Sequence, residues 1–91
     1  MNINIEEFRN RMTLQDIVNQ TNAFFVQTLD IDPSLISPDT ELKRDIGITS
    51  VDAMAIAAFI SKTFACPIVM REIKAVITLQ DLYDYIAAHT A

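Results

Sequence analysis

Apolar residues recur at helical spacing in separate stretches of the chain, and two of these stretches have the same start. The tetrapeptide Thr-Leu-Gln-Asp occurs at residues 13–16 and again at 78–81. A threonine followed three residues later by an acidic residue is typical of a helix N-terminus. The pattern therefore predicts a first helix from Thr13 to about Leu29 and a last helix that ends near Ala88.

Between these two helices the pattern predicts two more. An apolar run indicates a second long helix over residues 50–64, and the dipeptide Cys66-Pro67 marks its end. Residues 70–76 make at most two turns, a short third helix. The sequence thus predicts an all-α fold, a small four-helix bundle of three main helices and one short helix.

The segment between the first two helices, residues 30–45, is predicted to form a loop. It contains Pro33 and Pro38, and proline removes a backbone donor and disfavours helix in the residue before it. The β-branched pairs at 68–69 and 76–77 are too short to build a sheet. Four apolar residues are expected to fix the loop to the core: Leu35, Ile36, Leu42 and Ile46.

Helical spacing also predicts which side chains face the core. In the second helix the inward set is Ala53, Ala57, Ile60 and Phe64, and the set on the opposite side is Asp52, Ala55, Phe59 and Lys62. In the last helix the inward set is Leu79, Leu82, Tyr85 and Ile86. For Phe59 the alternative is burial beneath the loop, because apolar residues inside helices are commonly buried.

The sequence predicts one domain with a short N-terminal extension and without a signal region or membrane span. Residues 1–12 are interpreted as an N-terminal extension with a short helical turn, and residues 13–91 as one domain. The N-terminus has no apolar signal region, and the longest apolar run, residues 53–60, is far shorter than the ~20 residues of a membrane-spanning helix. We therefore expect a cytoplasmic protein without a membrane span.

Composition excludes several functional classes. The 91 residues fit one domain, and a net charge of −5, from 12 acidic against 7 basic residues, argues against nucleic acid as a partner. One cysteine cannot form an internal disulfide or a cysteine-based metal cluster. One glycine leaves no glycine-rich nucleotide loop. None of these features indicates an enzyme.

Three candidate chemistries are rejected on the residues themselves. Asp30, Asp32 and Ser34, with Glu41 at the twelfth position, copy the spacing of an EF-hand calcium loop, but Leu35 stands where the sharp turn requires glycine. The single histidine, His89, lies at the tail with no nucleophile beside it, and Cys66 is not at a helix N-terminus. We predict no metal site and no catalytic residue.

Ser50 has a more informative context. The long loop ends in Asp45-Ile46-Gly47, and the chain then presents Ser50 at the start of an apolar helix. Ser50 can itself cap this helix, but Thr49 and Asp52 can equally form the cap and leave the Ser50 hydroxyl pointing outward. A helix N-terminus favours negative charge, so a phosphodiester on Ser50 would be stabilised there.

With this serine in place, the chain resembles an acyl carrier protein. The family signature Asp-Leu-Gly-x-Asp-Ser-Leu reads Asp45-Ile46-Gly47-Ile48-Thr49-Ser50-Val51 here. The resemblance runs from about Asp16 to His89, with the helices in family order, and the tail at 77–86 is similar to the family's final helix. It implies that Ser50 carries 4′-phosphopantetheine, transferred from coenzyme A by a separate magnesium-dependent phosphopantetheinyl transferase.

The resemblance also implies a function without catalysis. Acyl groups would be carried as thioesters on the arm and presented to acyl-loading, condensing or modifying enzymes of fatty-acid, polyketide or related biosynthesis, with the carrier itself a monomer. Thr49 departs from the usual aspartate, and the second helix lacks the usual glutamates, which suggests a specialised carrier with an apolar docking patch. The residues expected to contact partners are Thr49, Val51, Asp52, Met54, Ala55, Ala58, Phe59 and Lys62.

Two alternatives remain open. One is a carrier-like interaction subunit whose helices bind a partner and which has no working arm. The other is an aminoacyl or peptidyl carrier of a nonribosomal peptide pathway.

Overall fold

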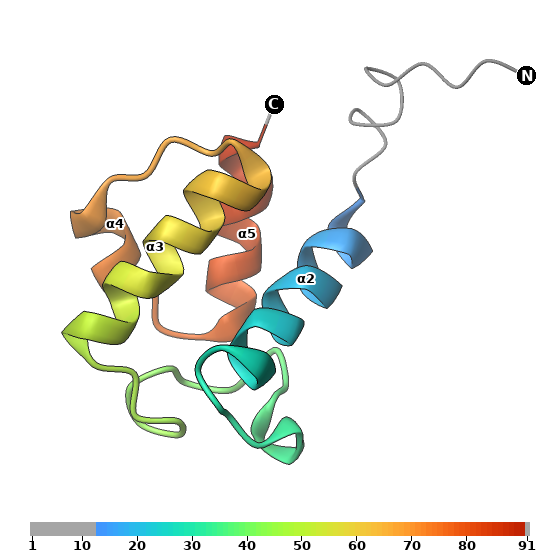
Figure 1. Ribbon diagram of the computed structural model, residues 1–91, viewed down its shortest axis with the longest axis vertical. Helices are drawn as coiled ribbons and strands as arrows, with labels where there is room; N and C mark the ends of the chain where they lie inside the picture. Colours follow the sequence, from blue (N-terminus) through green and yellow to red (C-terminus); the bar gives the residue numbers. More distant parts are fainter. Residues whose placement is uncertain (1–12, 91) are drawn as a thin grey trace, which may run out of the picture.

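The computed structural model describes residues 13–90 as a bundle of α-helices (Figure 1). Their bounds are α2, Leu14–Gln27; α3, Ser50–Phe64; α4, Met70–Ala75; and α5, Leu79–His89, with a short 3-10 turn, η1, at Pro33–Leu35. The part of the chain described here contains one isolated antiparallel bridge, between Glu41 and Thr78, and no strand. The predicted all-α bundle is confirmed. The predicted turn in residues 1–12 lies outside the described residues.

Three of these helices begin with the same reciprocal cap. In α2, α3 and α5 a threonine hydroxyl accepts the backbone N–H of an aspartate three residues later, and that aspartate accepts the threonine N–H. Each cap satisfies two donors that a helix start otherwise leaves unpaired. The predicted starts of the first and last helices are therefore confirmed, while α4 starts after Val69 without a side-chain cap.

The helices pack in two pairs, α2 against α5 and α3 against α4, around one core. Two expectations about this core are wrong. Tyr83, and not Tyr85, is the buried tyrosine of α5, and its hydroxyl donates to Asn22 of α2. Leu35 does not fix the loop to the core, because it is 47% exposed, whereas Leu42 is buried. Ile56 of α3 also belongs to the core, next to the predicted inward residues.

The connection between α2 and α3, residues 28–49, is tied to the far end of the chain by backbone hydrogen bonds. Leu42 N–H donates to Ile77 O at 2.9 Å, Leu79 N–H to Thr40 O at 3.0 Å, and Gln80 N–H to Pro38 O at 3.0 Å. These bonds hold the loop against the junction of α4 and α5. They fix the position from which the chain enters α3.

Helix α3 ends at Ala65, which adopts the left-handed conformation with φ 51°. This conformation costs a residue with a Cβ about 1–2 kcal/mol, a cost that glycine avoids. We expect Ala65→Gly to raise the free energy of unfolding by about 0.5–1 kcal/mol, because relief of the left-handed conformation exceeds the loss from the greater entropy of glycine in the unfolded chain. Urea unfolding of the two proteins measures it, and a destabilised variant would contradict the explanation.

Candidate functional site

Ser50 is the first residue of α3, and its hydroxyl is not needed to cap that helix. Thr49 Oγ1 accepts Asp52 N–H at 3.2 Å, and Asp52 Oδ2 accepts Thr49 N–H at 3.0 Å. The cap that the sequence left open therefore belongs to Thr49 and Asp52. Ser50 is exposed, so its hydroxyl is accessible to a modifying enzyme.

The turn before Ser50 is held together by its own polar groups. Asp45 accepts the Glu41 N–H at 2.8 Å and the Arg44 Nε–H at 3.1 Å, and Arg44 also pairs with Glu41 at 2.7 Å. The Arg44 guanidinium, with the Glu41 N–H, holds the pKa of the Asp45 carboxyl below its usual range. Asp45 therefore closes the turn. Gly47, at φ 67°, then reverses the chain toward Ser50 in a conformation that favours glycine.

A cavity of about 70 Å³ opens beside Ser50, between the turn, α3, α4 and α5. Its floor is apolar and consists of buried side chains: Leu42, Ala53, Ile56, Ile73 and Leu82. Its mouth is formed by exposed residues: Lys43, Thr49, Ser50 and Lys74. A group attached to Ser50 thus starts at the edge of a small apolar recess with two ammonium groups at its rim.

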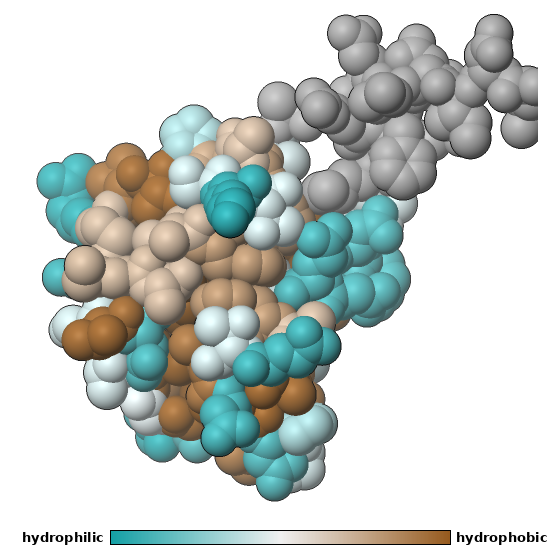
Figure 2. Space-filling view, viewed as in Figure 1, coloured by the Kyte–Doolittle hydropathy of each residue, from teal (hydrophilic) through white to brown (hydrophobic). Residues whose placement is uncertain are grey.

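The exposed side of α3 is apolar near Ser50. Val51 is 74% exposed and Met54 64% exposed, and Ala58 is exposed further along the helix. Of the other predicted contact residues, Thr49 and Lys62 are exposed, whereas Asp52 and Ala55 are half-buried. Figure 2 shows hydrophobic residues gathered on the side of the molecule where α3 and α4 lie, with hydrophilic residues over α2.

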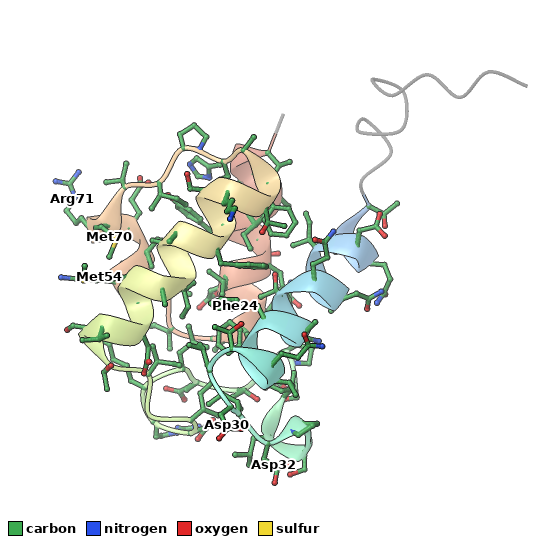
Figure 3. All side chains as sticks on the ribbon, in the orientation of Figure 1. Phe24, Asp30, Asp32, Met54, Met70 and Arg71 are labelled. Carbon is green, nitrogen blue, oxygen red and sulfur yellow. The ribbon has the colours of Figure 1, made fainter. Side chains whose placement is uncertain are left out.

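Phe59 does not lie on this surface, so its predicted outward position is wrong. Its ring stacks on Phe24 of α2 with the centroids 4.3 Å apart, and it forms a T-shaped pair with Phe64 with the centroids 5.7 Å apart. The side chain is half-buried against the core. Phe24 lies between α2 and α3, where this pairing joins the two helices (Figure 3). Phe59 is therefore part of the packing that positions α3.

Helix α4 contributes surface residues that sequence reasoning missed. Val69 is 45% exposed, and Met70 and Arg71 follow it at the start of α4, on the same side of the molecule as Met54 (Figure 3). The only sequence signal was the apolar character of residues 68–70 outside the long helices. The Tyr85 hydroxyl accepts Val69 N–H at 3.5 Å and donates to Glu72 at 2.9 Å, which ties this end of α4 to α5.

The residues of the rejected chemistries have structural roles. Asp32 accepts Ser34 N–H and caps η1, and Glu41 pairs with Arg44. His89 Nδ1–H donates to Tyr85 O at 2.8 Å, and burial raises the pKa of the Cys66 thiol. Within residues 13–90, no three His, Cys, Asp or Glu side chains are grouped to hold a metal ion. None of the described helices is long and apolar enough to cross a membrane.

Comparison with known families places the same region in one of them. The protein family described as "Phosphopantetheine attachment site" matches residues 23–86, which include Ser50 and its flanking turn and helices. The acyl carrier protein of onion yellows phytoplasma (strain OY-M) is 31% identical over 74 residues, 81% of this chain and 97% of that protein. Sequence and geometry thus point to the same serine-centred site.

Two further similarities extend the comparison. The non-reducing polyketide synthase azaA of Aspergillus niger is 33% identical over 72 residues, which are 79% of this chain but 3% of the synthase. The chain therefore spans a very small part of that relative. The solution structure of an apo doublet acyl carrier protein from prodigiosin biosynthesis has a TM-score of 0.69 at 22% identity, covering 84% of this chain and 37% of that one. This last likeness concerns the fold alone.

Proposed function

This chain belongs to the phosphopantetheine attachment-site family, that of the acyl carrier proteins, and on that premise we propose that Ser50 carries a 4′-phosphopantetheine group. Proteins of this family are generally non-catalytic carriers, and the group is attached covalently to a serine. The observation that carries the proposal is the exposed Ser50 hydroxyl, which Thr49 and Asp52 release from helix capping. The proposed carrier domain, residues 13–91, contains the whole family match.

Attachment requires a partner enzyme. A phosphopantetheinyl transferase with Mg²⁺ would join Ser50 Oγ to the phosphorus that bears the pantetheine of coenzyme A. The pyrophosphate bond of coenzyme A would break, adenosine 3′,5′-bisphosphate would leave with the bridging oxygen, and the transferase would take the hydroxyl proton. The chain would then present acyl groups as thioesters to acyl-loading, condensing or modifying enzymes. The described residues support a role as substrate, because the site offers a nucleophile and no general base of its own.

The docking surface in this proposal is the apolar face beside Ser50. Val51, Met54 and Ala58 of α3 lie there with the exposed Val69, which precedes α4. Ala55 of α3 and Met70 of α4 are half-buried beside them. The one carboxylate of α3, Asp52, is committed to the cap, and Lys62 lies in the last turn. We therefore expect partner association to depend on apolar burial and to weaken little with salt, unlike docking through exposed ion pairs.

The biosynthetic pathway of this carrier is proposed from its relatives. A polyketide synthase and acyl carrier proteins both match, which supports fatty-acid, polyketide or a related biosynthesis as the pathway of this carrier. We propose in addition that the carrier is a cytoplasmic monomer. Two competing functions are tested against it. One is an interaction subunit without a working arm, and the other is an aminoacyl or peptidyl carrier.

Mass spectrometry tests the proposal directly. The wild-type protein, incubated with coenzyme A, Mg²⁺ and a transferase of broad specificity, is expected to gain the mass of one phosphopantetheine group. Peptide mapping should place this mass on the fragment that contains Ser50. An unchanged mass with several transferases would support the interaction subunit. Loading by amino-acid-activating enzymes, but not by acyl-loading enzymes, would support the peptidyl carrier.

A further inference from the structure

Two lysines stand at the mouth of the cavity that Ser50 borders. Lys43 belongs to the turn before α3, and Lys74 belongs to α4, so two separate elements bring positive charge to one place. Both side chains are exposed. The chain as a whole carries a net charge of −5, so two lysines at one cavity mouth are opposite in sign to the overall charge.

The carboxylates near this mouth already have partners. Asp45 is bonded to Arg44 and to the Glu41 N–H, and Asp52 accepts the Thr49 N–H. Glu72, on the same helix as Lys74, accepts the Tyr85 hydroxyl at 2.9 Å. Within the described residues the salt bridges join Arg44 to Glu41 and Asp45 and include neither lysine. The two ammonium groups are thus available to an anion.

The proposed function places an anion at this position. A phosphodiester bonded to Ser50 Oγ carries one negative charge at any pH near neutrality, and it is attached to the residue that shares the cavity mouth with both lysines. Lysine binds phosphate as a point charge on a flexible stem, so it needs no rigid geometry to do so. We infer that Lys43 and Lys74 pair with the phosphodiester on Ser50 and hold the start of the arm at the cavity mouth.

This inference rests on the proposed function and adds two residues to it. The competing explanation is that the lysines attract acidic groups of a partner enzyme. The two explanations differ in a simple way. Pairing with the phosphodiester stabilises the modified carrier when it is alone in solution, whereas attraction of a partner has no effect until the partner is present.

The experiment compares the melting temperatures of the unmodified and modified protein, for the wild type and for the double variant Lys43→Gln/Lys74→Gln. Modification changes the melting temperature of each protein by a measurable amount. Because the wild type forms two exposed ion pairs that the double variant lacks, we expect this change to be about 4 °C more positive in the wild type. This gap should close in about 1 M salt, where the screening length is only about 3 Å. The phosphorus-31 chemical shift should respond to salt in the wild type and not in the double variant.

Matched variants and a separate mass measurement make each outcome decisive. Lys62→Gln removes one positive charge at the other end of α3 and should leave the wild-type change in melting temperature on modification unaltered. Lys43→Arg/Lys74→Arg keeps both positive charges and should show the wild-type change in melting temperature on modification. The pairing would be overturned if modification changed the melting temperature equally in the wild type and in Lys43→Gln/Lys74→Gln. It would also be overturned if these two substitutions changed only the transferase KM. Failure of the wild type to gain mass would instead overturn the proposed function.

Discussion

Ser50→Ala is expected to abolish attachment of the phosphopantetheine group and to leave the melting temperature within about 2 °C of the wild type. The reason is that different residues at the start of α3 provide the hydroxyl for attachment and the helix cap. In the proposed function Ser50 supplies an exposed nucleophile, while the reciprocal bonds between Thr49 and Asp52 cap the helix. Alanine at the first helical position removes the nucleophile and breaks neither bond. Intact-mass analysis and thermal melts of the same samples measure both properties.

Substitution of the neighbouring Thr49 should instead lower the melting temperature and leave Ser50 open to modification. Thr49→Ala removes the hydroxyl that accepts Asp52 N–H, and loss of such a cap costs about 1 kcal/mol, or roughly 4–8 °C in a domain of this size. Modification of Ser50 should still occur below the new melting temperature. Thr49→Ser keeps the hydroxyl and serves as the control. If Ser50→Ala were the more destabilising of the two, Ser50 and not Thr49 would cap α3.

Phe59→Ala should destabilise the fold more than any substitution on the exposed side of α3. The ring stacks on Phe24 at 4.3 Å and contacts Phe64, so its removal leaves a gap between α2 and α3. Full truncation of a buried phenylalanine costs about 3–5 kcal/mol. Because Phe59 is half-buried, we expect about 2–3 kcal/mol and a decrease in melting temperature of about 10–20 °C.

Met54→Ala provides the matched contrast on the same helix. Met54 is 64% exposed, so its truncation should change the free energy of unfolding by less than about 0.5 kcal/mol. Burial of a methionine at an interface contributes about 1.5–3 kcal/mol, and we therefore expect the transferase KM to rise roughly tenfold or more. Phe59→Ala, assayed well below its melting temperature, should leave that KM near the wild-type value. The reverse pattern would mean that Phe59 contacts the partner and Met54 does not.

The sequence was sufficient where one local interaction decides the structure. The Thr-Leu-Gln-Asp tetrapeptides at 13–16 and 78–81 predicted two helix starts, because a capping box forms within four residues and needs no tertiary partner. The position of Ser50 followed in the same way from the turn before it. The cap of α3 stayed open only because serine and threonine stand side by side, and both can accept the same N–H.

The sequence was insufficient to predict the burial of a side chain where a distant residue determines it. Helix α3 has no polar stripe over residues 53–60, so its spacing does not distinguish the buried from the exposed side. The position of Phe59 is set by Phe24, 35 residues earlier, and this pairing leaves no local pattern. Tyr83 is different, because residues 79, 82, 83 and 86 fit the helical repeat of a buried face. The sequence therefore contains the signal for Tyr83, and the predicted inward position of Tyr85 is wrong.

The backbone bonds between residues 38–42 and 77–80 also bear on how the chain is made. A ribosome releases the Ser50 signature well before it releases residues 77–80, and until then the loop has no anchor. A nascent chain, or one terminated before α5, therefore contains the serine and the local bonds of its turn, but not the bonds that hold the loop against the bundle. We expect transferases to modify Ser50 only after synthesis of α5, so that the attached group also distinguishes completed, folded chains from unfinished ones.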